Sequence, residues 1–322
     1  MARVAVGQMC AGADWRANLA AAGRLAAQAR AAGCGLLCLP EACAFLGGGA
    51  GAGQRFASAL DGPVMAEYRA LARREGLWLS VGGFQERPPE AAAAAAGAAG
   101  GAGRGGDGRP DGSAGDGGGG GGAPGKIFNT HVVLDAQGQT QGVYRKIHLF
   151  DVDVPGGPVL RETGYTLPGG ELSCVDTPFG RLGLTTCYDL RFPEMYQILR
   201  FDLGAEVLLV PSAFTVPTGA AHWEPLLRAR AIETQCYVLA AAQAGRHSEG
   251  RESYGHALAV DPWGRVAARR ADPCDEGIAV AEVDLDALAG IRRRMPVAQH
   301  RERGRAVLER FRGPGGAEAT SL

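Results

Sequence analysis

Short apolar runs that suit strands alternate with longer segments that suit helices through the first quarter of this chain. Residues 3–9 alternate like a strand, and residues 36–39 form a continuous apolar run typical of a strand covered on both faces. Between them, residues 14–32 begin with a capping aspartate and continue as an alanine-rich helix. Residues 63–75 suit a second helix and residues 77–83 a third strand. This order predicts an α/β protein.

The rest of the chain continues the mixed pattern. Residues 126–134 and 141–146 flank a turn and predict a hairpin. Residues 254–260 and 265–269 predict a second hairpin around the turn at 261–264. Further strands are expected at 206–211, 237–242 and 278–283, and further helices from His222 onwards and over 287–294.

Composition limits the partners that this chain could bind. Its 322 residues could form one large domain or two ordinary ones, and 33 Lys plus Arg balance 34 Asp plus Glu. No net charge therefore attracts nucleic acid or an anionic membrane, and a small-molecule substrate is expected. No apolar run reaches the roughly 18 residues of a transmembrane helix, and the first strand follows Met1 so closely that we expect no cleaved presequence.

The cysteines and histidines show no metal-binding pattern. Eight cysteines are scattered along the chain, and the group at Cys34, Cys38 and Cys43 has no second group to match it. Neither a zinc site nor a disulfide framework is supported, so we expect reduced thiols and a cytoplasmic protein. The six histidines lack ligand spacing, and no glycine-rich phosphate loop is present, so we expect no metal and no other cofactor.

Residues 88–125 consist largely of alanine and glycine and contain no large apolar side chain. Such a segment buries too little surface to offset the entropy of ordering it, so we expect a disordered surface insertion. A partner-binding segment is the alternative. We expect one domain over residues 1–312, interrupted by this insertion, and a loose tail over residues 313–322.

The segment from Gly183 to Glu194 places a cysteine where a strand gives way to a helix. Residues 181–186 suit a half-buried strand, and Pro193 suits the first turn of a following helix. Cys187 lies between them, where free backbone N–H groups can face a bound molecule, which suits a nucleophile with an oxyanion site. A free cysteine is more often a small buried apolar side chain, so its neighbours must decide between the two.

Glu41, Lys146 and Cys187 each follow a segment that we interpret as a strand. If these strands are neighbours in one sheet, the three side chains converge on one pocket. A carboxylate can take the thiol proton, and an ammonium stabilises the oxyanion that forms when sulfur attacks a carbonyl. Together they describe acyl transfer through a thioester. Taken singly, Glu41 could equally cap the next segment, and Lys146 could be a solvated charge.

Three blocks, in this order, resemble the signature sequences of the nitrilase, or carbon–nitrogen hydrolase, superfamily. The resemblance implies that Glu41 is the general base, Lys146 the oxyanion stabiliser and Cys187 the nucleophile, with Glu162 as a second carboxylate that positions the lysine and the substrate. It also implies a single domain with a four-layer α-β-β-α sandwich, and a homodimer or higher homo-oligomer that forms through helices. The blocks are Pro40-Glu41, Tyr144-Arg-Lys-Ile-His-Leu-Phe150 and Cys187-Tyr-Asp-Leu-Arg-Phe-Pro-Glu194.

Further blocks between residues 211 and 264 resemble one amidase branch of the superfamily, including Ser253-Tyr-Gly-His256. This resemblance implies hydrolysis of deaminated glutathione to 2-oxoglutarate and Cys-Gly, a repair of a damaged metabolite. An ω-amidase that acts on 2-oxoglutaramate, a carbamoylase and a nitrilase share the same three residues. A non-catalytic interaction protein on this fold is the alternative from another class. Residues 44–53 depart from the family pattern because they are unusually rich in glycine.

Three residues near the proposed nucleophile are candidates for substrate contact. The backbone N–H of Tyr188 is expected to share the oxyanion with Lys146. Phe214 and Thr215 follow a predicted strand and are candidate walls of the pocket.

An arginine is expected to bind a substrate carboxylate, because a guanidinium can hold one through two parallel hydrogen bonds. Arg191 and Arg246 are the candidates. The alternative for Arg191 is an ion pair with Asp189 or Glu194 that has only a structural role.

Overall fold

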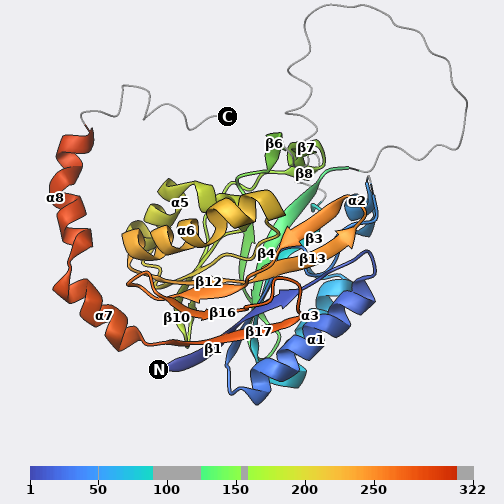
Figure 1. The fold of residues 1–322 in the computed structure, drawn as a ribbon, viewed down its shortest axis with the longest axis horizontal. Coiled ribbons are helices and arrows are strands. Elements are labelled where there is room, and N and C mark those ends of the chain that lie inside the picture. Colours follow the sequence, from blue (N-terminus) through green and yellow to red (C-terminus); the bar gives the residue numbers. More distant parts are fainter. Residues whose placement is uncertain (50, 90–124, 154–158, 310–322) are drawn as a thin grey trace, which may run out of the picture.

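The computed structural model describes residues 1–49, 51–89, 125–153 and 159–309. Two β-sheets pack against each other at the centre, and helices cover their outer faces (Figure 1). This is the four-layer α-β-β-α sandwich within a single α/β domain that the family resemblance implies, and that prediction is confirmed.

The larger sheet has nine strands among the described residues, in the order β14-β13-β1-β2-β3-β4-β5, with β17 paired to β1 and β8 to β4. Strands β1, β2 and β3 run parallel, so their carboxyl ends meet at one edge. The strands are β1 Ala2–Met9, β2 Leu36–Leu39, β3 Trp78–Glu86, β4 Ile127–Leu134, β5 Thr140–Arg145, β8 Thr166–Leu167, β13 Ala242–Ser248, β14 Arg251–Tyr254 and β17 Gly277–Val283.

The smaller sheet has six described strands in the order β16-β15-β12-β11-β10-β9, and β10, β11 and β12 run parallel. A separate ribbon of two strands, β6 Asp151–Asp153 and β7 Val159–Arg161, lies outside both sheets. The strands of the smaller sheet are β9 Cys174–Thr177, β10 Gly180–Leu184, β11 Val207–Leu209, β12 Tyr237–Ala240, β15 Leu258–Val260 and β16 Val266–Arg269.

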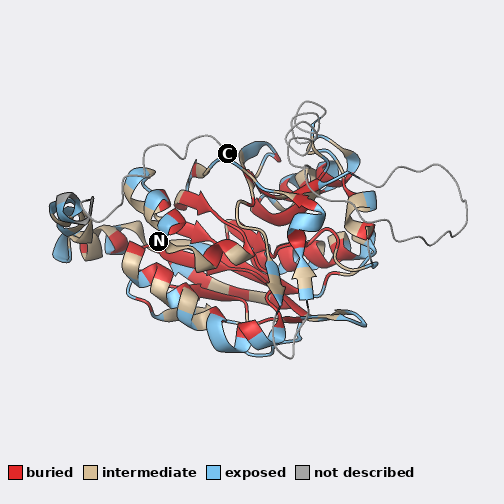
Figure 2. Cartoon of the chain, turned by 90° about the horizontal axis from the view of Figure 1, so that it is seen from above, coloured by how far each residue is buried: buried red, intermediate tan, exposed pale blue. Residues whose placement is uncertain are grey.

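Helices cover both outer faces of the sandwich, and Figure 2 shows buried strands enclosed by helices whose outward residues are exposed. Helices α1 (Trp15–Ala31) and α3 (Pro63–Glu75) pack on the larger sheet, whereas α5 (Pro193–Gln197) and α6 (Val216–Thr234) pack on the smaller one. The other helical segments are α2 Ala52–Phe56, α7 Leu285–Arg294, α8 Val297–Glu309, the 3₁₀ turns Glu162–Gly164 and Cys187–Arg191, and the π-helical Ile198–Asp202.

Alternate residues of the central strands face different layers. Val4, Val6 and Leu36 pack into the core between the two sheets, whereas Ala5 and Leu37 pack against the layer that contains α1 and α3. Both faces of these strands are therefore buried, which explains the continuous apolar run in β2. Each buried leucine contributes about 1.5–3 kcal/mol to folding. Burial on both faces therefore holds these strands in place, and with them the residues at their ends.

Several predicted elements differ from the structure. Helix α6 begins at Val216 rather than at His222, because Pro217 suits its first turn. The strand predicted over 254–260 is interrupted at Gly255 and His256, whose φ angles are 74° and 57°, so β14 joins the larger sheet and β15 the smaller.

The strand predicted over 237–242 is likewise divided. Strand β12 ends at Ala240 in the smaller sheet, and β13 begins at Ala242 in the larger one. Helix α8 was not predicted, and in Figure 1 it extends with α7 to one side of the sheets.

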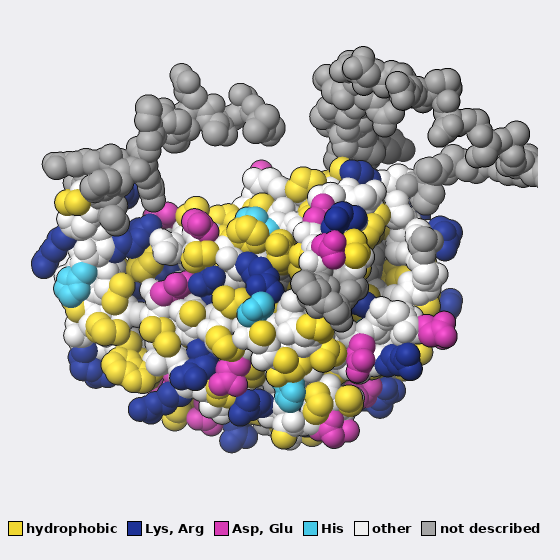
Figure 3. Space-filling model, turned by 45° about the horizontal axis from the view of Figure 1, so that its top comes forward, with side chains coloured by type: hydrophobic (Ala, Val, Ile, Leu, Met, Phe, Trp, Pro, Cys, Tyr) yellow, Lys and Arg dark blue, Asp and Glu magenta, His cyan; other side chains and the backbone are white. Residues whose placement is uncertain are grey.

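The glycine- and alanine-rich insertion and the tail fall mostly outside the described residues, which exclude 90–124 and 310–322. The domain boundary at residue 312 therefore stays a prediction. None of the described helices is long and apolar enough to cross a membrane. Basic and acidic side chains are interspersed with hydrophobic ones on the face that Figure 3 presents, in keeping with the balanced composition.

Candidate active site

Glu41, Lys146 and Cys187 lie at one end of the sandwich and line one cavity. Glu41 follows β2 and Lys146 follows β5, both in the larger sheet, but Cys187 follows β10 in the smaller sheet. The premise that all three strands are neighbours in one sheet is therefore wrong. The side chains converge across the interface between the sheets, because both sheets end at this edge.

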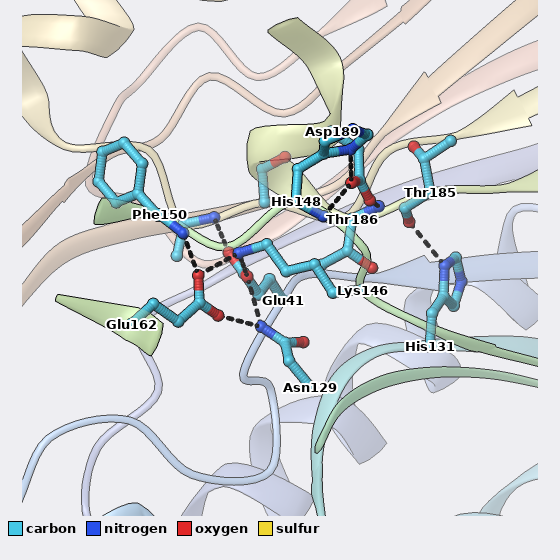
Figure 4. Close-up of polar contacts among 12 residues, drawn as sticks. Glu41, Asn129, His131, Lys146, His148, Phe150, Glu162, Thr185, Thr186 and Asp189 are labelled. Carbon is cyan, nitrogen blue, oxygen red and sulfur yellow. Dashed lines mark hydrogen bonds and ion pairs between the residues drawn. The ribbon is translucent and has the colours of Figure 1, made fainter. Parts of the chain in front are cut away.

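Lys146 is held between two carboxylates. Its Nζ lies 3.1 Å from Glu41 Oε1 and 2.8 Å from Glu162 Oε2, and its side chain is 2% exposed (Figure 4). Both carboxylates are buried as well. Removing either partner would leave buried charge without compensation, so this cluster fixes the position of the ammonium group.

Asn129, in β4, joins the two carboxylates. Its Nδ2 donates to Glu41 Oε1 at 2.9 Å and to Glu162 Oε1 at 3.1 Å. Sequence reasoning missed this residue, although the polar run Asn129-Thr-His131 between apolar residues of β4 is a signal that could have found it. Figure 4 shows Asn129 directed at both acids.

Backbone N–H groups complete the contacts of the two carboxylates. Phe150 N donates to Glu162 Oε2 at 2.7 Å, and Ala213 N donates to Glu41 Oε2 at 3.0 Å. Hydrogen bonds of this kind stabilise the ionised form of a carboxylate. Both carboxylates are therefore held in fixed orientations.

Cys187 has a backbone conformation that is rare for a residue with a side chain. Its φ is +49°, in the left-handed region, and its N–H donates to Pro211 O at 3.0 Å. Ala42, directly after Glu41, has φ +58°. Each such residue costs about 1–3 kcal/mol. The fold therefore maintains backbone strain at Cys187 and directly after Glu41.

Asp189 supports the turn that carries Cys187. The Thr186 N–H donates to Asp189 Oδ2 at 2.8 Å, and the Tyr144 hydroxyl donates to the same oxygen at 2.7 Å. His148 Nδ1 lies 2.8 Å from Asp189 Oδ1. Asp189 is fully buried and engaged by these three groups, so it is occupied inside the fold rather than by Arg191.

His131 connects the two sheets below the nucleophile. Its Nε2 lies 2.7 Å from Ser80 Oγ and its Nδ1 2.9 Å from Thr185 O (Figure 4). Burial lowers the pKa of His131 to about 4, so the ring is neutral near pH 7 and Nδ1 donates to the carbonyl. This histidine has a structural role in placing the segment before Cys187.

The surroundings assign a charge to each member of the trio. Burial would raise the pKa of the Glu41 carboxyl, but the Lys146 ammonium and a hydrogen bond from Cys187 hold it below its ordinary value. Burial would lower the pKa of Lys146, but Glu162 and Glu41 raise it well above its ordinary value. Burial and the charge of Glu41 raise the pKa of the Cys187 thiol well above its ordinary value. The resting site therefore holds a carboxylate, an ammonium and a neutral thiol.

A cavity of about 430 Å³ opens onto this cluster, a volume that suits a small molecule. One wall comes from residues 45–49 and 51–54, the glycine-rich segment that departs from the family pattern. The remaining described lining residues include Phe128, Phe150, Tyr165 and Arg251.

The predicted aromatic and threonine contacts lie beside this cavity and are not among its described lining residues. The Tyr188 ring packs edge-on against Phe150, with ring centroids 4.9 Å apart. Phe214 packs on Trp223 at 4.9 Å, and Thr215 is buried at the start of α6. Their roles in substrate binding stay predictions.

The two predicted arginines are also absent from the described lining. The Arg191 guanidinium carbon lies 5.8 Å from the ring centroids of Tyr188 and Phe214, and its Nη2 is 3.2 Å from His222 Nδ1. Arg246 Nη2 donates to Glu249 O at 3.3 Å. Carboxylate binding by either arginine stays a prediction.

All eight cysteines are free thiols. Within the described ranges, no group of three or more His, Cys, Asp or Glu side chains is arranged to hold a metal ion. The groups gathered at this site, a thiol, a carboxylate and an ammonium, are those of covalent acyl transfer.

The chain is similar to known proteins over nearly its whole length. A carbon–nitrogen hydrolase family profile matches residues 3–293. Deaminated glutathione amidase of Homo sapiens is 44% identical over 301 residues, which cover 92% of this chain and 81% of the human protein. The Bos taurus protein of that name is 43% identical with the same coverage. The crystal structure of the Caenorhabditis elegans NitFhit protein matches with a TM-score of 0.77 at 40% identity, over 94% of this chain and 66% of that one.

Proposed function

This chain belongs to the carbon–nitrogen hydrolase family, and on that premise we propose that it hydrolyses the linear amide of deaminated glutathione to 2-oxoglutarate and Cys-Gly. The observation that carries the chemistry is the contact of Lys146 with both Glu41 and Glu162 beside a buried Cys187. The choice of substrate is supported by the mammalian relatives, whose names state that activity. The reaction would repair a damaged metabolite.

In the first step, Glu41 accepts the thiol proton while Cys187 Sγ attacks the amide carbon. The lowered pKa of Glu41 and the raised pKa of Cys187 favour this assignment, because they leave the carboxyl ionised and the thiol protonated in the resting site. Both side chains line the same cavity, so we assign the proton transfer to this pair. The nucleophile therefore forms only as it reacts.

Lys146 Nζ and the Tyr188 N–H hold the oxygen that becomes negative as the tetrahedral intermediate forms. A buried ammonium stabilises such an oxyanion strongly, because water does not screen it. Glu162 and Asn129 keep the lysine and the base in position. Glu41 then gives its proton to the departing nitrogen, and a thioester remains on Cys187.

Hydrolysis of the thioester reuses the same carboxylate. Glu41 removes a proton from water as the water oxygen attacks the thioester carbon, and the proton passes to the departing sulfur. The carboxylic acid leaves, and the thiol and the carboxylate are restored. In these steps Glu41 accepts and returns each proton, and no metal ion or second base takes part.

Turnover of two amides tests the proposal. We expect the purified protein to release Cys-Gly from 2-oxoglutaryl-Cys-Gly, and Cys187→Ala to abolish this activity. Cys10→Ala is the matched control, because Cys10 is an exposed free thiol. If the protein released ammonia from 2-oxoglutaramate but no Cys-Gly from 2-oxoglutaryl-Cys-Gly, its activity would be that of an ω-amidase instead. Lack of turnover of any amide would contradict the catalytic assignment and favour a binding role.

We also propose that copies of the chain associate through helices, as the family resemblance implies, and that the layer of α5 and α6 is the surface they use. Large apolar side chains are exposed here, with Ile198 39%, Val216 39%, Ile232 49% and Trp263 55% exposed. Light scattering should give the mass of two or more chains, and Ile232→Glu should lower it. A wild-type mass of a single chain would refute this association.

A cytoplasmic location is proposed from the state of the cysteines. Eight free thiols, two of them exposed, suit a reducing compartment. Fractionation of cells that express the chain should find it with cytoplasmic markers.

A further inference from the structure

We propose that Arg251 binds a carboxylate in the acyl half of the substrate, so that the site selects monoamides of dicarboxylic acids. This inference rests on the proposed amidase function and names the group that recognises its substrate. Arg251 is the first residue of β14, and its half-buried side chain lines the cavity that contains Glu41 and Cys187.

The guanidinium of Arg251 has hydrogen-bonding capacity to spare. Its Nη2 makes a long contact of 3.4 Å to Ala213 O, and its Nε is buried without a partner among the described residues. A guanidinium has five N–H donors in a planar fork that fits a carboxylate. Buried donors without acceptors are costly, and a bound carboxylate would supply the acceptors.

Other arginines show why the missing counter-ion matters. The Nε atoms of Arg181 and Arg270 are also buried without a partner, but each guanidinium is near a carboxylate, Asp176 at 2.8 Å and Asp275 at 3.7 Å. Arg251 takes part in none of the ion pairs found among the described residues. It combines a free guanidinium with a place in the wall of the cavity.

The charges in the cavity leave Arg251 as the cation without an acidic partner among the described lining residues. Among the described lining residues, Glu41 and Glu162 are acidic, and Lys146 and Arg251 are basic. Lys146 already contacts both carboxylates, so the three residues together carry one negative charge. That charge would repel an anionic substrate. Arg251 cancels it and provides a positive end to the cavity.

Ala213 places Arg251 within reach of the reacting centre. Its N–H donates to Glu41 Oε2 at 3.0 Å, and its carbonyl accepts from Arg251. Arg251 and the base therefore contact the same residue. In a five-carbon dicarboxylic acyl group, the free carboxylate carbon lies four bonds, about 5 Å, from the attacked carbon. We place Cys187 at the attacked end of such a substrate and Arg251 at its free carboxylate, since both residues line the cavity.

Two amides of equal length test the assignment. Glutaramate has an amide at one end of a five-carbon chain and a carboxylate at the other. Pentanamide has the same number of carbons and no charge. Hydrolysis of either amide releases ammonia. We expect Arg251→Gln to raise the KM for glutaramate roughly 10- to 100-fold and to change pentanamide hydrolysis by less than about twofold. Arg251→Lys should recover part of the loss. Arg181→Gln is the matched control, because that arginine lies outside the cavity lining.

Binding gives a second readout that does not need catalysis. Calorimetry should show that Cys187→Ala protein binds glutarate, and that the double variant Cys187→Ala, Arg251→Gln binds it at least 10-fold more weakly. Equal losses on both amides, or glutarate binding that is unaffected by Arg251→Gln, would overturn the role of Arg251. Absence of amide turnover by the wild type, with Arg251-dependent glutarate binding intact, would instead refute the amidase function and leave this subsite standing.

Discussion

Gly83 lies so close to Glu41 that a methyl group on its Cα would stand 2.6 Å from Glu41 Cγ and 2.7 Å from Ala42 N. Gly83 also has φ +59°, a conformation that residues with a side chain rarely adopt. This glycine of β3 therefore leaves the space that Glu41 occupies, and we expect the site to depend on its lack of a side chain.

Gly83→Ala should displace Glu41 and lower kcat/KM by at least about 10-fold, since small misplacements of a reacting group are costly. The strained backbone should also lower the unfolding free energy by about 1–2 kcal/mol. Steady-state kinetics and thermal unfolding measure the two effects. Gly12→Ala is the control, because an added Cβ there would have no neighbour within 4 Å. Normal kinetics in Gly83→Ala would mean that Glu41 is placed by other contacts.

Asn129 gives a second test, in which two substitutions act differently. Asn129→Ala removes the donor shared by Glu41 and Glu162, and we expect a loss of about 10- to 100-fold in kcat. Asn129→Asp keeps the shape but adds a third carboxylate, which disfavours ionisation of Glu41 and raises its pKa. The acid limb of the pH–rate profile should therefore move to higher pH in both variants, because both lose the hydrogen bond that lowers the pKa of Glu41, and it should move further in Asn129→Asp. Profiles that match the wild type in both variants would show that Asn129 has only a packing role.

The convergence of Glu41, Lys146 and Cys187 on one cavity could be predicted because each residue follows a strand and lies in a recognisable block. Asn129 has no such context, since it is one of three consecutive polar residues in β4 and the pattern does not reveal their partners. The contacts from Phe150 and Ala213 come from backbone N–H groups, which leave no trace in a side-chain pattern. Arg251 was missed for a similar reason, because nothing local shows that its strand reaches the cavity.

The sheet assignments could not be read from the sequence either. Local patterns indicate that a segment is a strand, but its neighbours depend on contacts far along the chain. Cys187 was expected beside Glu41 within one sheet, yet it approaches from the other sheet. The interrupted strand at Gly255 shows the same limit, because two left-handed residues redirect β14 and β15 into different sheets.

The shifted pKa values of Glu41 and Cys187 predict a broad pH optimum for kcat/KM. The pKa of Glu41 lies below its ordinary value of 4.5, and the pKa of Cys187 lies above its ordinary value of 9.0. The carboxylate and the thiol therefore coexist between these limits, and kcat/KM should be flat from about pH 5 to about pH 9. An acid limb near pH 7 would show that Glu41 is not the base, or that its pKa is not depressed.

Stability should follow the same window. The depressed pKa of Glu41 contributes stability that is present above pH 4.5 and is lost as the pH falls through its folded-state value. The raised pKa values of Cys187 and Lys146 act in the opposite direction. Their contributions are present below pH 9.0 and 10.5 and are lost as the pH rises through the folded-state values. The free energy of unfolding should be measured with denaturant across this pH range. The fall in stability at low pH should be present in the wild type and absent in the control variant Glu41→Gln.

Alkylation by iodoacetamide tests whether Glu41 activates the buried thiol. On its raised pKa alone, Cys187 should react more slowly than the exposed Cys10 and Cys274 near pH 7. Proton transfer to Glu41 during attack removes this barrier, so we expect Cys187 to be labelled faster than either in the wild type. In Glu41→Gln its rate should fall below theirs, while Cys10 and Cys274 react as before. Mass spectrometry of tryptic peptides gives all three rates in one sample. Equal slowing of all three thiols would point to a general change in the fold, and an unchanged rate at Cys187 would exclude Glu41 as its base.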